Sequence, residues 1–252
     1  MQNLMIMKRI ALFFAVLTVC LSSLAGLTDG EVISYTLSLG FIKGGEASLI
    51  TKKTNYRGKE AYEVSLIVST TKAVDKLFSI RDTLTTTVTS DIEPLFFTKH
   101  CFENDDIVYE TAEFSREGEN DYRGRLMKRY KEGDEKRLDT ICPRPIYDMV
   151  SLVLYARNID LENAVEGQRF QFSMADAAVV ENENLIYMGR SRVKVAGEQK
   201  DCQVFSLVQP YTEKGKSKEK ELIRIFVSDD AERIPVQMDI NLPVSKARAR
   251  MR

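Results

Sequence analysis

The stretch Ile33-Ser34-Tyr35-Thr36-Leu37-Ser38-Leu39 decides the fold class of this 252-residue chain. Its apolar residues take every second position, and serine or threonine stands between them. Successive side chains of a β-strand point to opposite faces of the sheet, so this pattern predicts a strand with one buried and one solvated face. Glu110 interrupts one of the later runs. The alternation recurs in residues 62–68, 84–88, 108–114, 170–174, 204–208 and 234–242.

Short polar segments that contain glycine separate these runs. They are residues 55–59, 117–120, 132–135 and 196–201. Such compositions favour turns. Strands joined by short turns must pair antiparallel, because parallel neighbours need a long crossover connection. One polar face per strand agrees with an antiparallel sheet. We therefore predict an all-β fold, mainly antiparallel, in the form of a curved sheet or an open barrel.

One segment breaks the alternation and predicts a helix over residues 145–158. Pro145 suits the first turn of a helix, where its missing N–H does no harm. Asp148 near the start and Arg157 near the end complement the helix dipole. The strands before and after this segment are similar in number, so we predict two similar β halves joined by a central helix. Apolar residues recur at helical spacing at Ile146, Met149, Val150, Val153 and Leu154.

Residues 1–25 have the parts of a secretory signal peptide. Lys8 and Arg9 form a positive start, residues 10–21 are apolar, and Ser23-Leu24-Ala25 offers the small residues that a signal peptidase reads. The apolar run is shorter than the roughly 20 residues that a membrane span needs, so we favour cleavage after Ala25 over a retained membrane helix. We then expect a periplasmic protein with one β-rich domain over residues 26–252 and no transmembrane segment.

The cysteines leave two questions open. Lipoprotein anchoring at Cys20 is a minor alternative to cleavage, because Val19 stands where a lipidated cysteine normally follows a small residue. Cleavage would leave Cys101, Cys142 and Cys202, an odd number with at least one free thiol unless chains pair. Export permits one disulfide among them. The sequence does not choose between such a pair and three buried thiols.

Charge argues against a nucleic-acid partner. Removal of residues 1–25 takes away two of the 36 Lys and Arg residues and none of the 37 Asp and Glu residues, which leaves 34 cations against 37 anions. A nucleic-acid binder would need a basic face. The run at residues 214–220 alternates in sign and contains glycine and serine, which predicts a solvated loop.

Motifs for common catalytic chemistry are missing from the sequence. The chain has one histidine, His100, and neighbouring strand residues face opposite ways, so His100 and Cys101 do not form a catalytic pair. No Gly-x-Ser-x-Gly elbow, dinucleotide fingerprint or phosphate loop occurs. Residues 103–106 lack the ligand spacing of a calcium loop and favour a hairpin turn. We assign no catalytic residue, no metal site and no cofactor.

Several segments in order carry a resemblance to a known family. They are Lys43-Gly44-Gly45-Glu46-Ala47, Ile80-Arg81-Asp82, Tyr147 to Leu152 with Tyr155-Ala156-Arg157, Ile225 to Asp230 and Arg233 to Val236. From about Val32 to the end, the chain resembles the exported bacterial proteins grouped as domain of unknown function 3108. The resemblance implies an envelope location and a β-rich fold. It lends no activity.

Two groups of polar residues are candidate ligand contacts. Ser151 and Tyr155 are four residues apart and therefore neighbours on a helix. We hypothesise that some of these groups meet where the helix lies on the sheet. The structural alternative is that Asp148 and Arg157 are helix-end charges and the rest hold the helix in place. The candidates are Arg81 and Asp82 in the first group, and Asp148, Ser151, Tyr155 and Arg157 in the second.

Three functions remain open. A non-enzymatic binding protein for a lipid or another apolar ligand predicts an apolar concavity between β walls. An assembly factor that contacts an envelope protein predicts a filled core and an exposed edge or apolar patch. A carboxylate-dependent hydrolase acting on envelope glycan or lipid predicts a polar cleft with two close acids, one of raised pKa. We favour the first two over the hydrolase.

Overall fold

The computed structural model describes residues 26–76, 78–242 and 245–252. In this part of the chain fifteen strands form one continuous sheet, in the order β8-β7-β6-β5-β4-β3-β2-β1-β15-β14-β13-β12-β11-β10-β9. The elements are β1 (Val32–Leu39), β2 (Ile42–Tyr56), β3 (Lys59–Thr70), β4 (Arg81–Val88), β5 (Pro94–Glu103), β6 (Asp106–Arg116), β7 (Tyr122–Tyr130), β8 (Glu135–Cys142), β9 (Ile146–Tyr147), α2 (Met149–Asn158), β10 (Arg169–Asp176), β11 (Val179–Val195), β12 (Glu198–Glu213), β13 (Lys216–Ser228), β14 (Pro235–Asn241) and β15 (Lys246–Met251).

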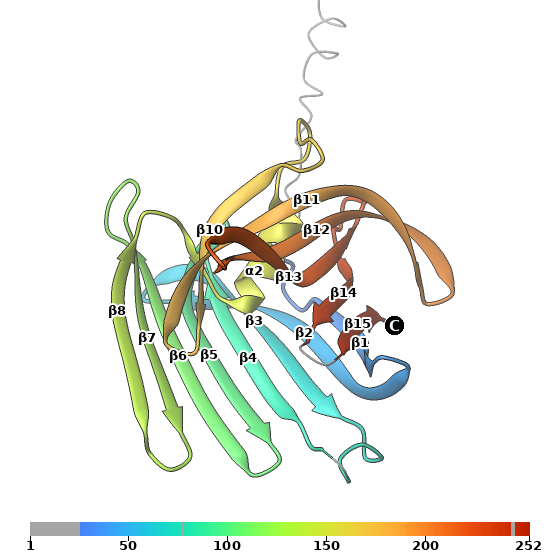
Figure 1. The fold of residues 1–252 in the computed structure, drawn as a ribbon, viewed down its shortest axis with the longest axis horizontal. Helices are drawn as coiled ribbons and strands as arrows, with labels where there is room; N and C mark the ends of the chain where they lie inside the picture. Colours follow the sequence, from blue (N-terminus) through green and yellow to red (C-terminus); the bar gives the residue numbers. More distant parts are fainter. Residues whose placement is uncertain (1–25, 77, 243–244) are drawn as a thin grey trace, which may run out of the picture.

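The sheet curls into a nearly closed barrel around the helix (Figure 1). Neighbouring strands are antiparallel, apart from the short parallel pair of β9 and β10. Strand β1 pairs with β15, with Tyr35 opposite Met251, and this pairing joins the first half of the chain to the second. The predicted fold, mainly antiparallel β with one central helix, is therefore confirmed, and the sheet takes the barrel form of the two that the sequence allowed.

The opening strand shows why the alternation sets the fold. Ile33 and Tyr35 on one face of β1 are buried, and Val32 on the other face is exposed. The Tyr35 hydroxyl donates a hydrogen bond to the Pro235 carbonyl oxygen at 2.9 Å. This bond satisfies the polar end of a buried aromatic side chain and ties the opening strand to the start of β14. The buried side chains of β1 thus pack where β1 pairs with β15 and the two halves meet.

The helix begins at Met149, so the predicted start at Pro145 was wrong. Ile146 and Tyr147 form β9, where Ile146 lies opposite Ser173 of β10. Ser173 also donates its backbone N–H to the Pro145 carbonyl oxygen at 2.9 Å. Pairing with a strand that comes later in the chain therefore takes these residues out of the helix, although their apolar spacing suits one.

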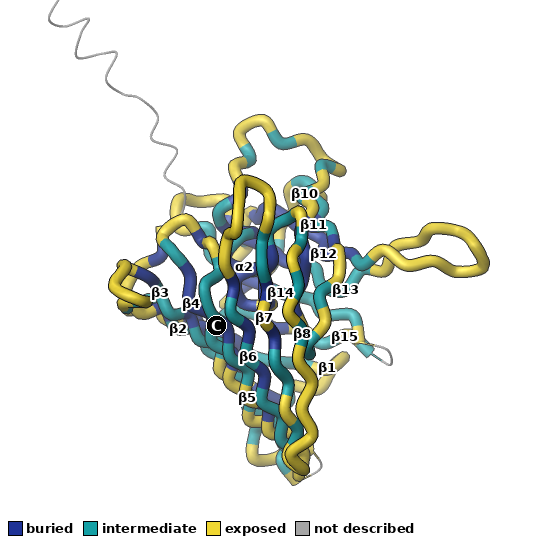
Figure 2. The backbone as a smooth tube through the Cα atoms, turned by 90° about the vertical axis from the view of Figure 1, so that its left-hand side faces the viewer, coloured by how far each residue is buried: buried dark blue, intermediate teal, exposed yellow. Residues whose placement is uncertain are grey.

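The helix contributes to two hydrophobic clusters inside the barrel. Val150 and Leu154 pack into the cluster that includes Ile33, Tyr35 and other residues of the first half. The other helix face supplies two residues to the cluster of β10 to β13, Leu152 and Ala156. Figure 2 shows the buried residues gathered at the barrel interior around α2. The helix therefore packs against the hydrophobic cores of both halves.

Several hairpin turns agree with the sequence. Residues 104–105 join β5 and β6 as the predicted solvated turn. Residues 214–220 stay exposed as predicted, but they form a β-hairpin in which Glu213 pairs with Lys216. The predicted signal peptide, including Cys20, falls on residues 1–25 and lies outside the described residues. No helix among the described residues has the length and apolar character needed to cross a bilayer.

Candidate functional site

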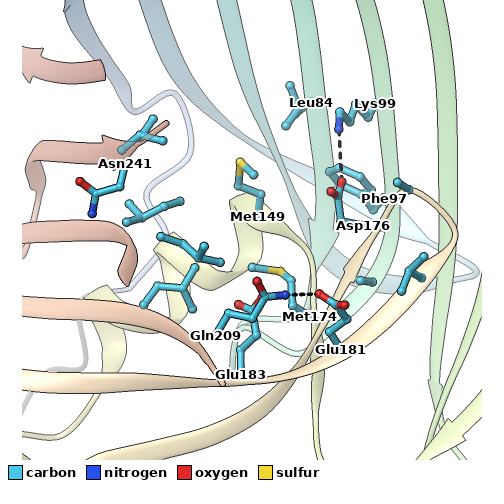
Figure 3. A pocket seen from close by; sticks show the side chains of 17 residues that line it. Leu84, Phe97, Lys99, Met149, Met174, Asp176, Glu181, Glu183, Gln209 and Asn241 are labelled. Carbon is cyan, nitrogen blue, oxygen red and sulfur yellow. Dashed lines mark hydrogen bonds and ion pairs between the residues drawn. The ribbon is translucent and has the colours of Figure 1, made fainter. Parts of the chain in front are cut away.

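A cleft of about 420 Å³ lies between the two halves of the barrel (Figure 3). Its volume falls within the range of about 300–1,000 Å³ that is usual for small-molecule sites. One wall comes from β4 and β5, the other from β10 to β14, and the first residue of the helix lies between them. We call this space the inter-half cleft. Its apolar lining consists of Leu84, Phe97, Met149, Met174, Ala175, Ala177, Val179, Leu207, Leu222, Ile223 and Ile240.

Polar side chains that line the cleft are mostly engaged with one another. The Lys99 ammonium lies 3.2 Å from Asp176 and 3.6 Å from Glu110. Burial disfavours the Lys99 ammonium, but the two carboxylates outweigh this effect, so that the pKa of Lys99 is raised. The Gln209 amide donates a hydrogen bond to Glu181. These pairs leave few polar atoms of the cleft without a partner.

Glu183 on β11 is the exception among the polar groups of the cleft. Its side chain is only 4% exposed, and its Oε2 atom has no hydrogen-bond partner among the described residues. Burial, and then the nearby charges of Glu181 and Asp176, raise the pKa of Glu183 from 4.5 to about 7. Glu183 therefore holds a buried carboxyl group that can take up or release a proton near neutral pH.

The sequence contained a signal for Glu183 that was missed. Side chains two positions apart share a face of a strand. Glu183 therefore faces the same way as Leu185 and Tyr187, and both of these are buried. Extending the apolar alternation back along β11 would have placed Glu183 inside the barrel. Nothing in the sequence says that it borders an open cleft there.

The tip of the β10–β11 hairpin closes one side of the cleft. Asp176 pairs with Val179, so Ala177 and Ala178 form a two-residue turn, with φ of 52° and 60°. Both residues lie in the left-handed region, which alanine adopts only at a cost of about 1–2 kcal/mol. Three other two-residue turns of the barrel have glycine at the second position: Arg57–Gly58, Ala196–Gly197 and Lys214–Gly215.

A buried carboxylate of the opposite half holds this hairpin tip. Glu110 on β6 is 4% exposed, and its Oε2 accepts the Ala177 backbone N–H at 3.0 Å. Its Oε1 lies 3.3 Å from the Lys128 ammonium and 3.6 Å from that of Lys99. The Glu110 carboxylate, which interrupts the apolar alternation of β6, thus connects the two halves beside the cleft.

The first group of predicted site residues lies away from the helix. Arg81 stands at the start of β4, where it is exposed and pairs with Asp75. The Asp82 carboxylate accepts the Phe102 backbone N–H at 3.1 Å, and burial raises its pKa. Neither side chain lines the cleft.

The structure brings two members of the second group together at the helix start. The Asp148 carboxylate accepts the Ser151 hydroxyl at 2.7 Å and the Thr86 hydroxyl of β4 at 2.8 Å. It also accepts the Val150 and Ser151 backbone N–H groups as the helix N-cap. Burial raises the pKa of Asp148, and these hydrogen bonds act against that rise. All of its partners are protein groups, so Asp148 fixes where the helix begins and is attached.

Tyr155 and Arg157 also have structural partners. The Tyr155 ring stacks on the Tyr147 ring with centroids 4.8 Å apart, and burial raises the pKa of Tyr155. Arg157 is 2% exposed and forms two hydrogen bonds with the Glu31 carboxylate, at 2.7 and 2.9 Å. It also donates to the carbonyl oxygens of Arg233 and Glu232. None of the six predicted residues lines the cleft.

In the described part of the chain, Cys101, Cys142 and Cys202 are free thiols. Burial, and then Asp82, raise the pKa of Cys101 to about 12. The ligand atoms of Asp82, Cys101 and Glu103 lie within 4.8 Å of one another, as in a metal site. The firmly held thiol proton opposes metal binding there, because a thiol must ionise to act as a ligand.

Comparison with known proteins informs the fold and the family. No curated protein matches the chain. A crystal structure described as a β-barrel-like protein of domain of unknown function DUF1849, from Brucella abortus, superposes with a TM-score of 0.52 at 14% identity. The match covers 88% of this chain and 94% of the other, and it shows a shared fold. The family model described as protein of unknown function (DUF3108) matches residues 34–252, so this chain belongs to the DUF3108 family.

Proposed function

We propose that this protein binds an amphiphilic ligand by its apolar chain in the inter-half cleft, and that it does so in the cell envelope after export. The observation that carries the proposal is the apolar lining of a cleft of about 420 Å³ between the two halves. Apolar surface that faces a cleft remains in contact with water until a ligand covers it. Burying an alkyl chain there contributes about 0.8 kcal/mol of favourable binding free energy for each methylene removed from water.

Met149 supports this proposal from the helix. It is the first residue of α2, lines the cleft and is 39% exposed, although the rest of the helix is largely buried. Methionine is flexible and polarisable, which suits it to contacts with alkyl chains of differing shape. Together with Met174 on β10, it places two thioether side chains in the same apolar lining.

A hydrolase is the second candidate, and Glu183 is the observation that favours it. A buried carboxyl group with a pKa of about 7 suits a general acid or base. Glu181, two residues earlier on the same face of β11, supplies a second acid in the cleft. Binding is the better-supported function, because Glu181 is engaged by Gln209 and the surrounding lining is mostly apolar.

Displacement of a neutral fluorescent probe, N-phenyl-1-naphthylamine, tests the binding proposal. We expect dodecanol to displace the probe from residues 26–252, and Met149→Glu to weaken dodecanol at least fivefold, because a carboxylate then stands against the chain. Met188→Glu is the matched control, since Met188 is equally exposed at 39% but lies outside the cleft lining. Equal affinities for both variants would reject the cleft as the binding site.

Two further measurements separate the other parts of the proposal. Cell fractionation of the full chain tests export: processing after Ala25 and recovery in the envelope support it, and an unprocessed chain in the cytoplasm rejects it. Turnover of chromogenic alkyl esters and glycosides tests the second candidate. Hydrolysis that Glu183→Gln abolishes would replace binding with catalysis as the function of the cleft.

A further inference from the structure

We propose that the inter-half cleft selects amphiphiles whose head group carries a protonated amine, and that Glu183 is the anchor for that amine. This inference rests on the proposed binding function and names the ligand class. It is argued from the one buried carboxyl group of the cleft that lacks a partner, and from the charges around it.

Glu183 has an unsatisfied hydrogen-bond acceptor. Buried polar atoms in proteins nearly always have a hydrogen-bond partner, and an exception needs an explanation. Glu183 is 4% exposed and lines the cleft, yet its Oε2 accepts no hydrogen bond from the described residues. Because the carboxyl group borders the cleft, rotation about its terminal bond would present this oxygen to a donor supplied by a ligand.

The side chains that line the cleft carry more negative than positive charge. Three carboxylates line the cleft, those of Asp176, Glu181 and Glu183, against one ammonium, that of Lys99. Lys99 is already shared between Asp176 and Glu110, at 3.2 and 3.6 Å. An ammonium head group would add the missing positive charge, whereas a carboxylate or phosphate head would be repelled.

The charged groups of the cleft lie at two separate places. Figure 3 shows Glu181, Glu183 and Gln209 together at one end of the cleft, and the Lys99–Asp176 ion pair beside Leu84 at the other. Met149 lies between these two ends in the same view. The opposite charges of Lys99 and Asp176 offset each other, so the carboxyl groups beside Gln209 form the acidic end for a head group, and the apolar side chains of the lining are left to contact the chain of an amphiphile.

The proton held by Glu183 agrees with this assignment. Burial and the neighbouring carboxylates raise its pKa to about 7. An ammonium at hydrogen-bond distance favours the ionised carboxylate and acts against both effects. Binding of an amine would then form a charge-assisted hydrogen bond, which is stronger than a neutral one.

Three probes with the same twelve-carbon chain test the proposal at pH 8: dodecylamine, dodecanol and dodecanoate. Each displaces N-phenyl-1-naphthylamine from residues 26–252. We expect dodecylamine to bind at least tenfold more tightly than dodecanol, which corresponds to about 1.4 kcal/mol, and dodecanoate to bind most weakly. Glu183→Gln should bring dodecylamine to within about twofold of dodecanol, and the ratio of the two affinities measured in the same variant is the readout.

Glu181→Gln is the matched control, because Glu181 lines the same cleft but is already engaged by Gln209. We expect it to keep most of the preference for dodecylamine. If Glu183→Gln fails to fold, Glu183→Asp keeps the charge but withdraws it by one methylene, and the preference should fall to an intermediate value.

The outcomes separate the two proposals. Displacement by none of the three probes overturns the binding function itself. Displacement by all three with equal affinity, or a preference that persists in Glu183→Gln, overturns the head-group assignment and leaves the binding function standing. A tenfold preference that both glutamine variants abolish equally would assign the selection to the summed charge of the cleft and overturn the role of Glu183 as the anchor.

Discussion

The raised pKa of Glu183 makes the stability of the barrel depend on pH in a defined direction. The pKa of this group is about 7 in the folded protein against an ordinary value of 4.5. Between these values the folded state holds a proton that the unfolded chain has released. The contribution of Glu183 to stability is therefore fully present below pH 4.5 and is lost as pH rises towards and through 7. Glu183→Gln removes the titrating group and with it this loss.

The size of the effect follows from the two pKa values. At about 1.4 kcal/mol for each pKa unit, the difference amounts to about 3 kcal/mol. Because the cleft is open to water, screening reduces this figure, and we expect about 1–2 kcal/mol. Asp148 also titrates with a raised pKa, but it does so in both proteins and cancels from the comparison.

Urea unfolding of residues 26–252 at intervals from pH 4.5 to pH 8.5 measures this effect. The free energy of unfolding of the wild-type protein should fall by about 1–2 kcal/mol more than that of Glu183→Gln over this range, at an unchanged slope against urea. Any constant cost of the new amide shifts the variant's curve without changing its pH dependence. Parallel curves for the two proteins would show that Glu183 has an ordinary pKa in the folded state.

Three other substitutions test the remaining parts of the structure. Arg157→Met should lower the free energy of unfolding by about 3–5 kcal/mol, because it leaves the partly buried Glu31 carboxylate without its ion-pair partner. Adding Glu31→Gln should recover part of this loss. No recovery in the double variant would contradict a stabilising ion pair. Ala178→Gly should raise stability by about 1 kcal/mol, because glycine adopts a φ of 60° without strain; a loss of stability would contradict the turn geometry. Asp148→Ala should lower the free energy of unfolding by about 3 kcal/mol, because it removes a helix cap and leaves two hydroxyl groups without an acceptor. It should leave dodecanol binding unchanged. Weaker dodecanol binding by a fully folded variant would show that Asp148 contributes to the ligand site.

Much of the fold could be predicted from the sequence, because burial on one face of an antiparallel strand dictates the period-two pattern. Ile33 and Tyr35 illustrate this directly. The start of the helix could not be predicted, because Ile146 and Tyr147 leave the helix only through pairing with β10, which lies later in the chain. Local spacing and tertiary pairing compete there, and the pairing prevails.

The candidate site could be predicted less well. Asp148 and Arg157 stood out as charges near helix ends, and the structure gives both of them protein partners. Glu183 and Glu110 lie in rows of alternating residues that turn inward, so their burial was readable in the sequence. The cleft beside Glu183 was not readable, because it arises where β10 and β11 meet the opposite half. The Ala177–Ala178 turn lacks the usual turn residues and depends on the distant Glu110.

Native mass spectrometry of the protein purified from its own host, followed by lipid extraction, identifies any ligand that occupies the inter-half cleft. We expect a bound amphiphile with an amine head group, which Met149→Glu loses and Met188→Glu keeps. A bare protein, or an amphiphile that both variants retain to the same extent, would contradict binding in the inter-half cleft.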